Sequence, residues 1–162
     1  MEFFAKYGLD TSKAEVFNSE YQVRLGDFIY YQEHAKEVLT YLKGKVLQCA
    51  VTNGTKLAQN KKLSKSGFNK IFDHVFISED IGIEKPNIGY FEKVFEAIGD
   101  YKKDEIIIVG DSLTSDIKGG NNAGILTCFY NPKYKEKKVN VHIDYEIDDL
   151  NEVLNIIKES SK

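Results

Sequence analysis

The sequence has few cysteines, no long apolar stretch and little excess charge of either sign. Its two cysteines, Cys49 and Cys128, lie far apart inside apolar runs. That placement is typical of small buried side chains in a reduced protein and not of a disulfide framework. No apolar run approaches the roughly 20 residues that a membrane-spanning helix needs, and the first residues lack the basic-then-apolar layout of a secretory signal. We therefore expect a cytoplasmic protein.

The charge balance argues against two classes of partner. The 162 residues include 22 Lys and Arg against 25 Asp and Glu, which gives a formal net charge of −3. A mildly acidic chain has no electrostatic footprint for nucleic acid or for an anionic membrane, so we expect neither partner. With 42% hydrophobic and 29% charged residues, the composition is that of a globular domain with its own core.

The pattern of residues 1–32 predicts helices only. Ser12 and Glu15 have the spacing of a capping box that opens a helix. An apolar stripe at near-helical spacing follows and needs a partner surface. Its members are Phe17, Tyr21, Leu25 and Phe28.

Residues 33–162 open with a helix over 35–42 and then change to alternating strands and helices. Strands are expected at 46–51, 74–77, 106–109 and 125–129, with an edge strand at 141–145 and a last helix capped by Asp148. Nearly continuous apolar strands separated by helices are typical of a parallel sheet with helices on both faces. The sequence therefore predicts an α/β fold, to which residues 1–32 add a separate lobe.

The first candidate site follows the first predicted strand, at Thr52-Asn53-Gly54. In an open parallel sheet, sites form at the carboxyl ends of strands. A hydroxyl beside free backbone N–H groups suits phosphate oxygens. The alternative is an ordinary strand-to-helix turn in which Thr52 or Asn53 caps the helix.

The second candidate is Lys85, which lies between Glu84 and Pro86 after the second strand. Proline restricts the residue before it to an extended conformation, so a stiff loop can aim the Lys85 ammonium at a phosphoryl group. The alternative is a solvated surface lysine.

The third candidate comprises Asp111 and Asp116, which follow the third strand about one helical turn apart. Carboxylate oxygens suit Mg²⁺, which takes one or two carboxylates together with waters and substrate phosphate. The alternative assigns Asp111 or Ser112 to helix capping and Asp116 to a favourable place in the first helical turn.

Taken in this order at successive strand ends, the three motifs resemble the haloacid dehalogenase superfamily of Mg²⁺-dependent phosphohydrolases. Thr52 is similar to the second motif of that family, Lys85 before proline to the third, and Gly110-Asp111 with Asp116 to the fourth. The resemblance runs from about residue 35 to residue 162 and is greatest to the pyrimidine 5′-nucleotidase branch. It implies a Rossmann-like three-layer core over 33–162, with residues 1–32 as the rear part of a helical cap.

The resemblance also implies a role for each site residue. Thr52 and the Asn53 amide would hold phosphate oxygens, and Lys85 would offset charge on the nucleophile and the phosphoryl group. Asp111 would ligate Mg²⁺, and Asp116 would orient a metal-bound water or Lys85.

One family motif has no counterpart. The family's first motif, Asp-x-Asp-x-Thr or Val, ends a central strand between the strands that end at Thr52 and Asp111; its first Asp attacks phosphorus and its second acts as general acid and base. This sequence contains no Asp-x-Asp and no predicted strand before Lys45. We interpret the chain as incomplete, whether truncated, proteolysed or the product of a split gene. We expect it to be inactive alone, and the missing segment, carried by another chain, is a candidate partner.

The predicted function is Mg²⁺-dependent hydrolysis of a phosphate monoester through an aspartyl-phosphate. The substrate would be a small phosphorylated metabolite such as a nucleoside monophosphate. One alternative is a 2-haloacid dehalogenase, which needs no metal and would leave the Gly110-Asp111-Ser112 motif unexplained. The other is a non-catalytic module that completes another polypeptide.

Overall fold

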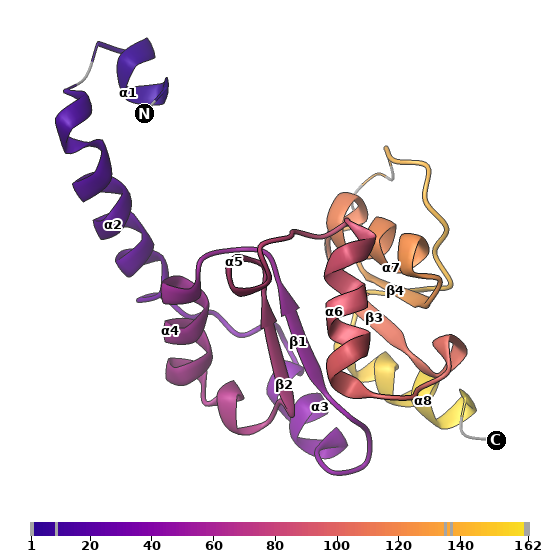
Figure 1. Cartoon of the computed structure of the whole chain (residues 1–162). Coiled ribbons are helices and arrows are strands. Elements are labelled where there is room, and N and C mark those ends of the chain that lie inside the picture. Colours follow the sequence, from indigo (N-terminus) through magenta and orange to yellow (C-terminus); the bar gives the residue numbers. More distant parts are fainter. Residues whose placement is uncertain (1, 9, 135, 137, 161–162) are drawn as a thin grey trace.

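The computed structural model of the chain describes residues 2–8, 10–134, 136 and 138–160. An arm of helices projects from the rest of the molecule at the N-terminal end (Figure 1). It consists of α1 (Glu2–Lys6), a 3-10 turn (Thr11–Lys13) and α2 (Ala14–Leu25). Within the described ranges, every helix falls short of the length and apolar character that crossing a membrane requires.

The remainder is built from parallel strands separated by helices. The strands are β1 (Cys49–Thr52), β2 (His74–Ile77), β3 (Ile107–Gly110), β4 (Leu126–Tyr130) and β5 (Tyr145–Ile147). The helices are α3 (Ala35–Leu42), α4 (Lys56–Ser66), α5 (Ser78–Ile81), α6 (Ile88–Ile98), α7 (Lys118–Ala123) and α8 (Val153–Ser160). All strand pairs are parallel, so the predicted α/β class is confirmed.

Helices cover both faces of the strands because neighbouring strand residues point to opposite sides. Ile107 packs into a core with α3 and α8, whereas the next residue, Ile108, packs into a second core with α6 and α7. In the second core Tyr90 and Phe91 of α6 are almost completely buried. Full burial of a side chain such as Phe91 contributes roughly 2 kcal/mol. The result is the predicted three-layer arrangement.

The strands form two separate sheets. β1 pairs with β2, and β3, β4 and β5 form the second sheet in that order. Among the described residues no strand joins β1 to β3, so both of these strands present an unpaired edge. Val109 of β3 is 37% exposed. The break between the two sheets lies where the sequence resemblance places the central strand of the family.

Three local predictions are wrong. Ser12 forms no capping box, because its hydroxyl donates to Asp10 at 2.6 Å and α2 begins only at Ala14. The edge strand begins at Tyr145 and covers none of residues 141–144. The last helical segment is capped by Asp149, whose carboxylate accepts from the Asn151 N–H, and not by Asp148.

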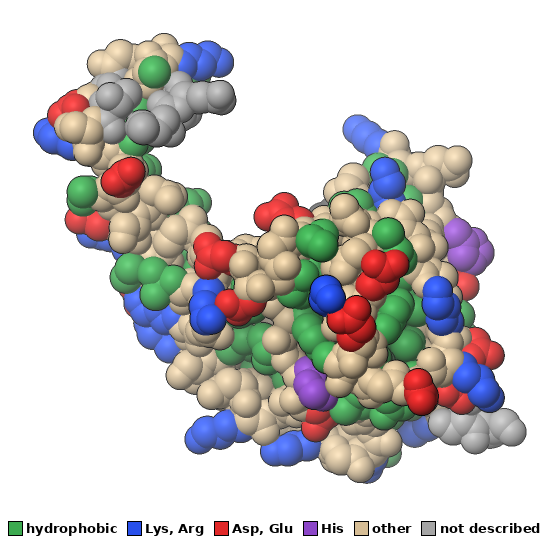
Figure 2. All heavy atoms as spheres, in the orientation of Figure 1, with side chains coloured by type: hydrophobic (Ala, Val, Ile, Leu, Met, Phe, Trp, Pro, Cys, Tyr) green, Lys and Arg blue, Asp and Glu red, His purple; other side chains and the backbone are tan. Residues whose placement is uncertain are grey.

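The apolar stripe of α2 has no covering surface in the described part of the chain. Phe17 stacks on Tyr21 with ring centroids 6.4 Å apart, and Phe4 contacts Phe17 edge-on. All three rings belong to the arm itself. Phe17, Tyr21 and Phe28 remain exposed, and Figure 2 shows hydrophobic side chains along the arm, facing solvent.

Candidate functional site

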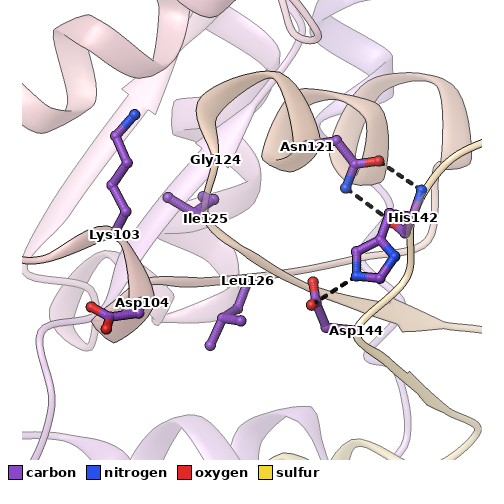
Figure 3. A pocket seen from close by; sticks show the side chains of 8 residues that line it. All are labelled: Lys103, Asp104, Asn121, Gly124, Ile125, Leu126, His142 and Asp144. Carbon is purple, nitrogen blue, oxygen red and sulfur yellow. Dashed lines mark hydrogen bonds and ion pairs between the residues drawn. The ribbon is translucent and has the colours of Figure 1, made fainter.

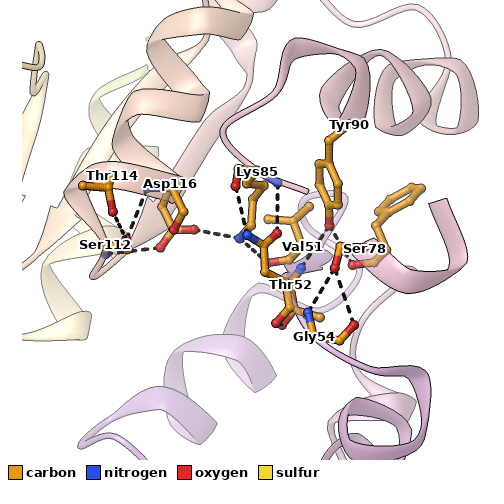
Figure 4. Close-up of polar contacts among 12 residues, drawn as sticks. Val51, Thr52, Gly54, Ser78, Lys85, Tyr90, Ser112, Thr114 and Asp116 are labelled. Carbon is orange, nitrogen blue, oxygen red and sulfur yellow. Dashed lines mark hydrogen bonds and ion pairs between the residues drawn. The ribbon is translucent and has the colours of Figure 1, made fainter. Parts of the chain in front are cut away.

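Lys85 and Asp116 meet at the carboxyl ends of β1 and β3. The Lys85 ammonium lies 2.7 Å from Asp116 Oδ1 and donates to the Val51 carbonyl, also at 2.7 Å (Figure 4). Lys85 is only 8% exposed, so the alternative of a solvated surface lysine is wrong. A buried ammonium is stable only when paired and hydrogen-bonded, and these two contacts meet that requirement.

Asn53 holds the backbone of Lys85. The Asn53 side-chain amide donates to the Lys85 carbonyl at 2.9 Å, and its carbonyl oxygen accepts from the Lys85 N–H at 3.0 Å. This reciprocal pair fastens the loop after β2 to the turn after β1. The side chain of Asn53 therefore positions Lys85, a contact that the sequence did not predict.

The turn that carries Thr52 is less free than expected. The Thr52 N–H donates to the Tyr90 hydroxyl at 3.0 Å, and that hydroxyl donates to the Phe76 carbonyl at 2.7 Å. The Gly54 N–H donates to Ser78 Oγ at 3.0 Å. The Thr52 and Gly54 N–H groups, which were expected to be free for phosphate, are thus engaged within the chain. The Asn53 N–H takes part in neither of these bonds.

Burial raises the pKa of the Tyr90 hydroxyl well above its usual value. The hydroxyl therefore stays protonated and keeps both of its hydrogen bonds, which join the ends of β1 and β2. The sequence alone did not distinguish Tyr90 from the apolar residues beside it in α6. Ser78 had a detectable signal, because it directly follows β2 at the same edge of the sheet as Thr52.

Asp116 is fixed from two sides. Its second carboxylate oxygen accepts from the Ser112 N–H at 3.2 Å, and Ser112 in turn caps the following helical segment through the Ser115 N–H. A Cβ on Gly110 would lie 2.5 Å from the Asp116 carboxylate. Glycine is therefore required for Asp116 to approach the strand end. The capping alternative holds for Ser112, whereas Asp116 pairs with Lys85.

Asp111 is exposed and directly follows β3. The pKa of Tyr130 is raised, chiefly by burial of its hydroxyl. The negative charges of carboxylates, among them Asp149, Glu33 and Asp111, raise it further. The carboxylates thus create a negative potential at this edge, which favours a cation. No group of three or more His, Cys, Asp or Glu in the described ranges could hold a metal ion. Among the described residues, Asp111 could therefore hold a metal ion only together with oxygen donors from elsewhere.

A hollow of about 560 Å³ lies at the other end of the sheet (Figure 3). It borders the beginning of β4, and His142 on its wall contacts Asp144 at 3.1 Å. The predicted residues Thr52, Asn53, Lys85, Asp111 and Asp116 do not line it. The hollow is therefore separate from the candidate site.

Known proteins resemble this chain in sequence and in fold. The pyrimidine 5′-nucleotidase PynA of Streptococcus pneumoniae is 38% identical over 111 residues, which are 68% of this chain and 47% of that protein. A glyceraldehyde 3-phosphate phosphatase of Methanopyrus kandleri is 38% identical over 117 residues, or 70% of this chain and 50% of that protein. The magnesium-bound crystal structure of the HAD-hydrolase YfnB of Bacillus subtilis matches with a TM-score of 0.86 and 35% identity, covering 95% of this chain and 67% of that one.

The chain spans about half the length of the curated relatives it matches. Residues 1–130 match the haloacid dehalogenase-like hydrolase family, and both the parallel strands and the order of the strand-end motifs agree with that match. The protein belongs to the haloacid dehalogenase-like hydrolase family.

Proposed function

We propose that this chain forms part of a Mg²⁺-dependent phosphatase whose nucleophile comes from an Asp-x-Asp segment outside the 162 residues. The observation that carries the proposal is the buried Lys85–Asp116 pair. Lys85 binds the Val51 carbonyl at the end of β1, and Asp116 lies against the end of β3. A strand between β1 and β3 would bring its last residues to this pair.

Each residue has a role that its position supports. The fixed Lys85 ammonium offsets negative charge on the attacking carboxylate and on the phosphoryl group, and Asp116 holds it in place. The Thr52 hydroxyl and the Asn53 N–H donate to phosphate oxygens. Asp111, together with carboxylates of the added segment, would hold Mg²⁺, which supplies further charge stabilisation to the phosphoryl oxygens when bound.

The names of two relatives support a proposal for the substrate class. Those reported above are named as a pyrimidine 5′-nucleotidase and a glyceraldehyde 3-phosphate phosphatase. Both names refer to enzymes that act on small phosphorylated metabolites. A small phosphate monoester, such as a nucleoside monophosphate, is the substrate class that we propose.

We also propose that residues 1–32 are part of a larger helical cap. The exposed rings of Phe17, Tyr21 and Phe28 form an apolar surface that further helices would cover. Figure 2 shows that the molecule is hollowed between the arm and the region of α6 and α7. A substrate bound at the strand ends would lie on this side.

The test completes the sheet and measures hydrolysis. The chain is combined with a segment bearing an Asp-x-Asp strand, either fused before Met1 or added as a peptide, and release of phosphate from an aryl phosphate is followed. We expect Mg²⁺-dependent turnover, and none with a control segment whose first Asp is replaced by Asn. A stable complex with no turnover would contradict the proposal.

A variant tests the metal ligand. Asp111→Asn in the completed protein should raise the Mg²⁺ concentration needed for half-maximal activity at least tenfold, because a neutral amide binds Mg²⁺ more weakly than a carboxylate does. Asp104→Asn is the control, since Asp104 borders the hollow at the other end of the sheet. Unchanged Mg²⁺ dependence in Asp111→Asn would remove Asp111 from the metal site.

A further inference from the structure

The arm is fastened to α4 at the joint that follows α2. Gly26 is buried there, and a Cβ at this position would lie 2.8 Å from the Lys61 side chain. Lys61 donates to the Val23 carbonyl at 3.0 Å. The arm thus lies directly on α4, with the aliphatic part of Lys61 against the backbone of the joint.

Two ion pairs strengthen this joint. Asp27 lies 2.7 Å from the Lys61 ammonium and 2.6 Å from that of Lys65. Hydrogen bonds from Lys61 and Lys65 lower the pKa of Asp27 to about 2. Asp27 is therefore charged at neutral pH, and both lysines of α4 hold the end of the arm.

A separate contact joins the middle of the arm to the start of α4. The Thr55 hydroxyl donates to Gln22 Oε1 at 2.8 Å. Thr55 Oγ1 in turn accepts from the Ala58 N–H, so Thr55 is the N-cap of α4. Thr55 directly follows the turn of Thr52, Asn53 and Gly54. Gln22 therefore contacts the residue that connects this turn to its helix.

The turn is also held from the side of α5. The Gly54 N–H donates to Ser78 Oγ at 3.0 Å, and the Lys56 N–H donates to Glu79 Oε2 at 2.7 Å. These two amides flank Thr55 and report on whether the turn is closed onto α5. A shift of the backbone at Thr55 would displace both amides from their acceptors on α5.

We propose that Gln22 is a positioning residue, which acts through Thr55 to fix the phosphate-binding turn whenever the arm lies on α4. Gly26 and Asp27 attach the end of the arm to α4. Gln22 then couples the position of the arm to the conformation of the turn. The proposal rests on the proposed function, in which Thr52 and Asn53 hold phosphate oxygens.

Amide hydrogen exchange on the chain itself tests this coupling. Gln22→Met removes the acceptor of the Thr55 hydroxyl, and the Gly54 and Lys56 amides should exchange about fivefold faster, as expected for loss of one hydrogen bond. Gln22→Glu keeps an acceptor oxygen and should exchange as the unchanged chain does. Gln32→Met makes the same change at an exposed position and should leave both amides unaffected.

The outcomes are distinct from those of the activity test. Exchange at these amides requires no turnover. The coupling can therefore fail while the phosphatase proposal holds, and the phosphatase proposal can fail while the coupling holds. Unchanged exchange in Gln22→Met would overturn the coupling. Equal acceleration in Gln22→Met and Gln22→Glu would also overturn it, because the effect would then not depend on the acceptor. Amides of β4 serve as the internal measure that the fold is intact.

Discussion

At the scale of single residues, the stability of the site depends on the pairing of two buried charges. Lys85 and Asp116 have side chains that are 6% and 13% exposed, and their charged atoms lie 2.7 Å apart. Such a pair adds little compared with apolar residues of the same size, but removal of one partner leaves the other charge buried alone. A single substitution in the pair therefore costs more stability than the net contribution of the pair suggests.

We predict that Lys85→Met lowers the free energy of unfolding by about 3 kcal/mol, because Asp116 then lacks a counter-ion. Urea denaturation measures this change. Lys93→Met is the matched control, since Lys93 pairs with Glu96 on the exposed face of α6, and its loss should cost no more than about 0.5 kcal/mol. Equal effects at the two lysines would contradict the burial argument.

Gly110 offers a second prediction at this scale. Gly110→Ala places a Cβ 2.5 Å from the Asp116 carboxylate, which must move and weaken its bond to Lys85. We expect a loss of about 1–3 kcal/mol in the free energy of unfolding, as overpacking typically causes. In the control, Gly89→Ala, the nearest atom is the flexible end of Ile83 at 3.1 Å, so no loss is expected. A Gly110→Ala chain as stable as the unchanged one would show that Asp116 does not need this close approach.

At the scale of elements, the start of α3 is joined to the C-terminal part of the chain through His34. His34 has a φ of 59°, which is uncommon for a residue other than glycine, and its Nδ1 lies 2.8 Å from Asp149 Oδ1. The hydrogen bond with Asp149 raises the pKa of His34. The Asn151 N–H, and then His34, lower the pKa of Asp149.

The stability that this pair adds depends on pH in a defined direction. A histidine with a raised pKa in the folded state stabilises fully below its ordinary pKa of 6.5, and that contribution is lost as the pH rises through the raised value. The contribution of Asp149 is lost as the pH falls below 3.8 and through its lowered pKa. His34→Gln should therefore lower Tm most between about pH 4 and 6.5, and progressively less at higher pH. A Tm difference that stays constant from pH 5 to pH 9 would contradict this account.

The elements show which parts of the structure the sequence could predict. Apolar strands and the glycines that end α4 and α6 are local signals, and Gly67 and Gly99 indeed follow these helices. Parallel strands end at one edge of a sheet, which is why the sequence placed its candidate sites after β1, β2 and β3. The contacts of Tyr90 and of the Asn53 side chain were not predictable, because they depend on how separate loops fold against each other. Ser12 illustrates the same limit, since its hydroxyl had Asp10 as a competing local partner.

At the scale of the whole molecule, the divided sheet is the central feature. Unpaired strand edges are usually covered or charged, whereas among the described residues β1 and β3 each have an unpaired edge, and Val109 of β3 is partly exposed. Helices already cover both faces of the strands. In the described part of the chain, helices thus cover both faces of a divided sheet, which is the form expected if another strand carries the nucleophile as proposed above.

The most direct measurement is to find which polypeptide carries the phosphoryl group. The chain and a separate Asp-x-Asp peptide are incubated with Mg²⁺ and an acyl phosphate, quenched rapidly in acid and weighed by intact mass spectrometry. We predict that the peptide gains the mass of one phosphoryl group and that the 162-residue chain gains none. Phosphorylation of the chain itself, with or without the peptide, would contradict the claim that its nucleophile comes from outside.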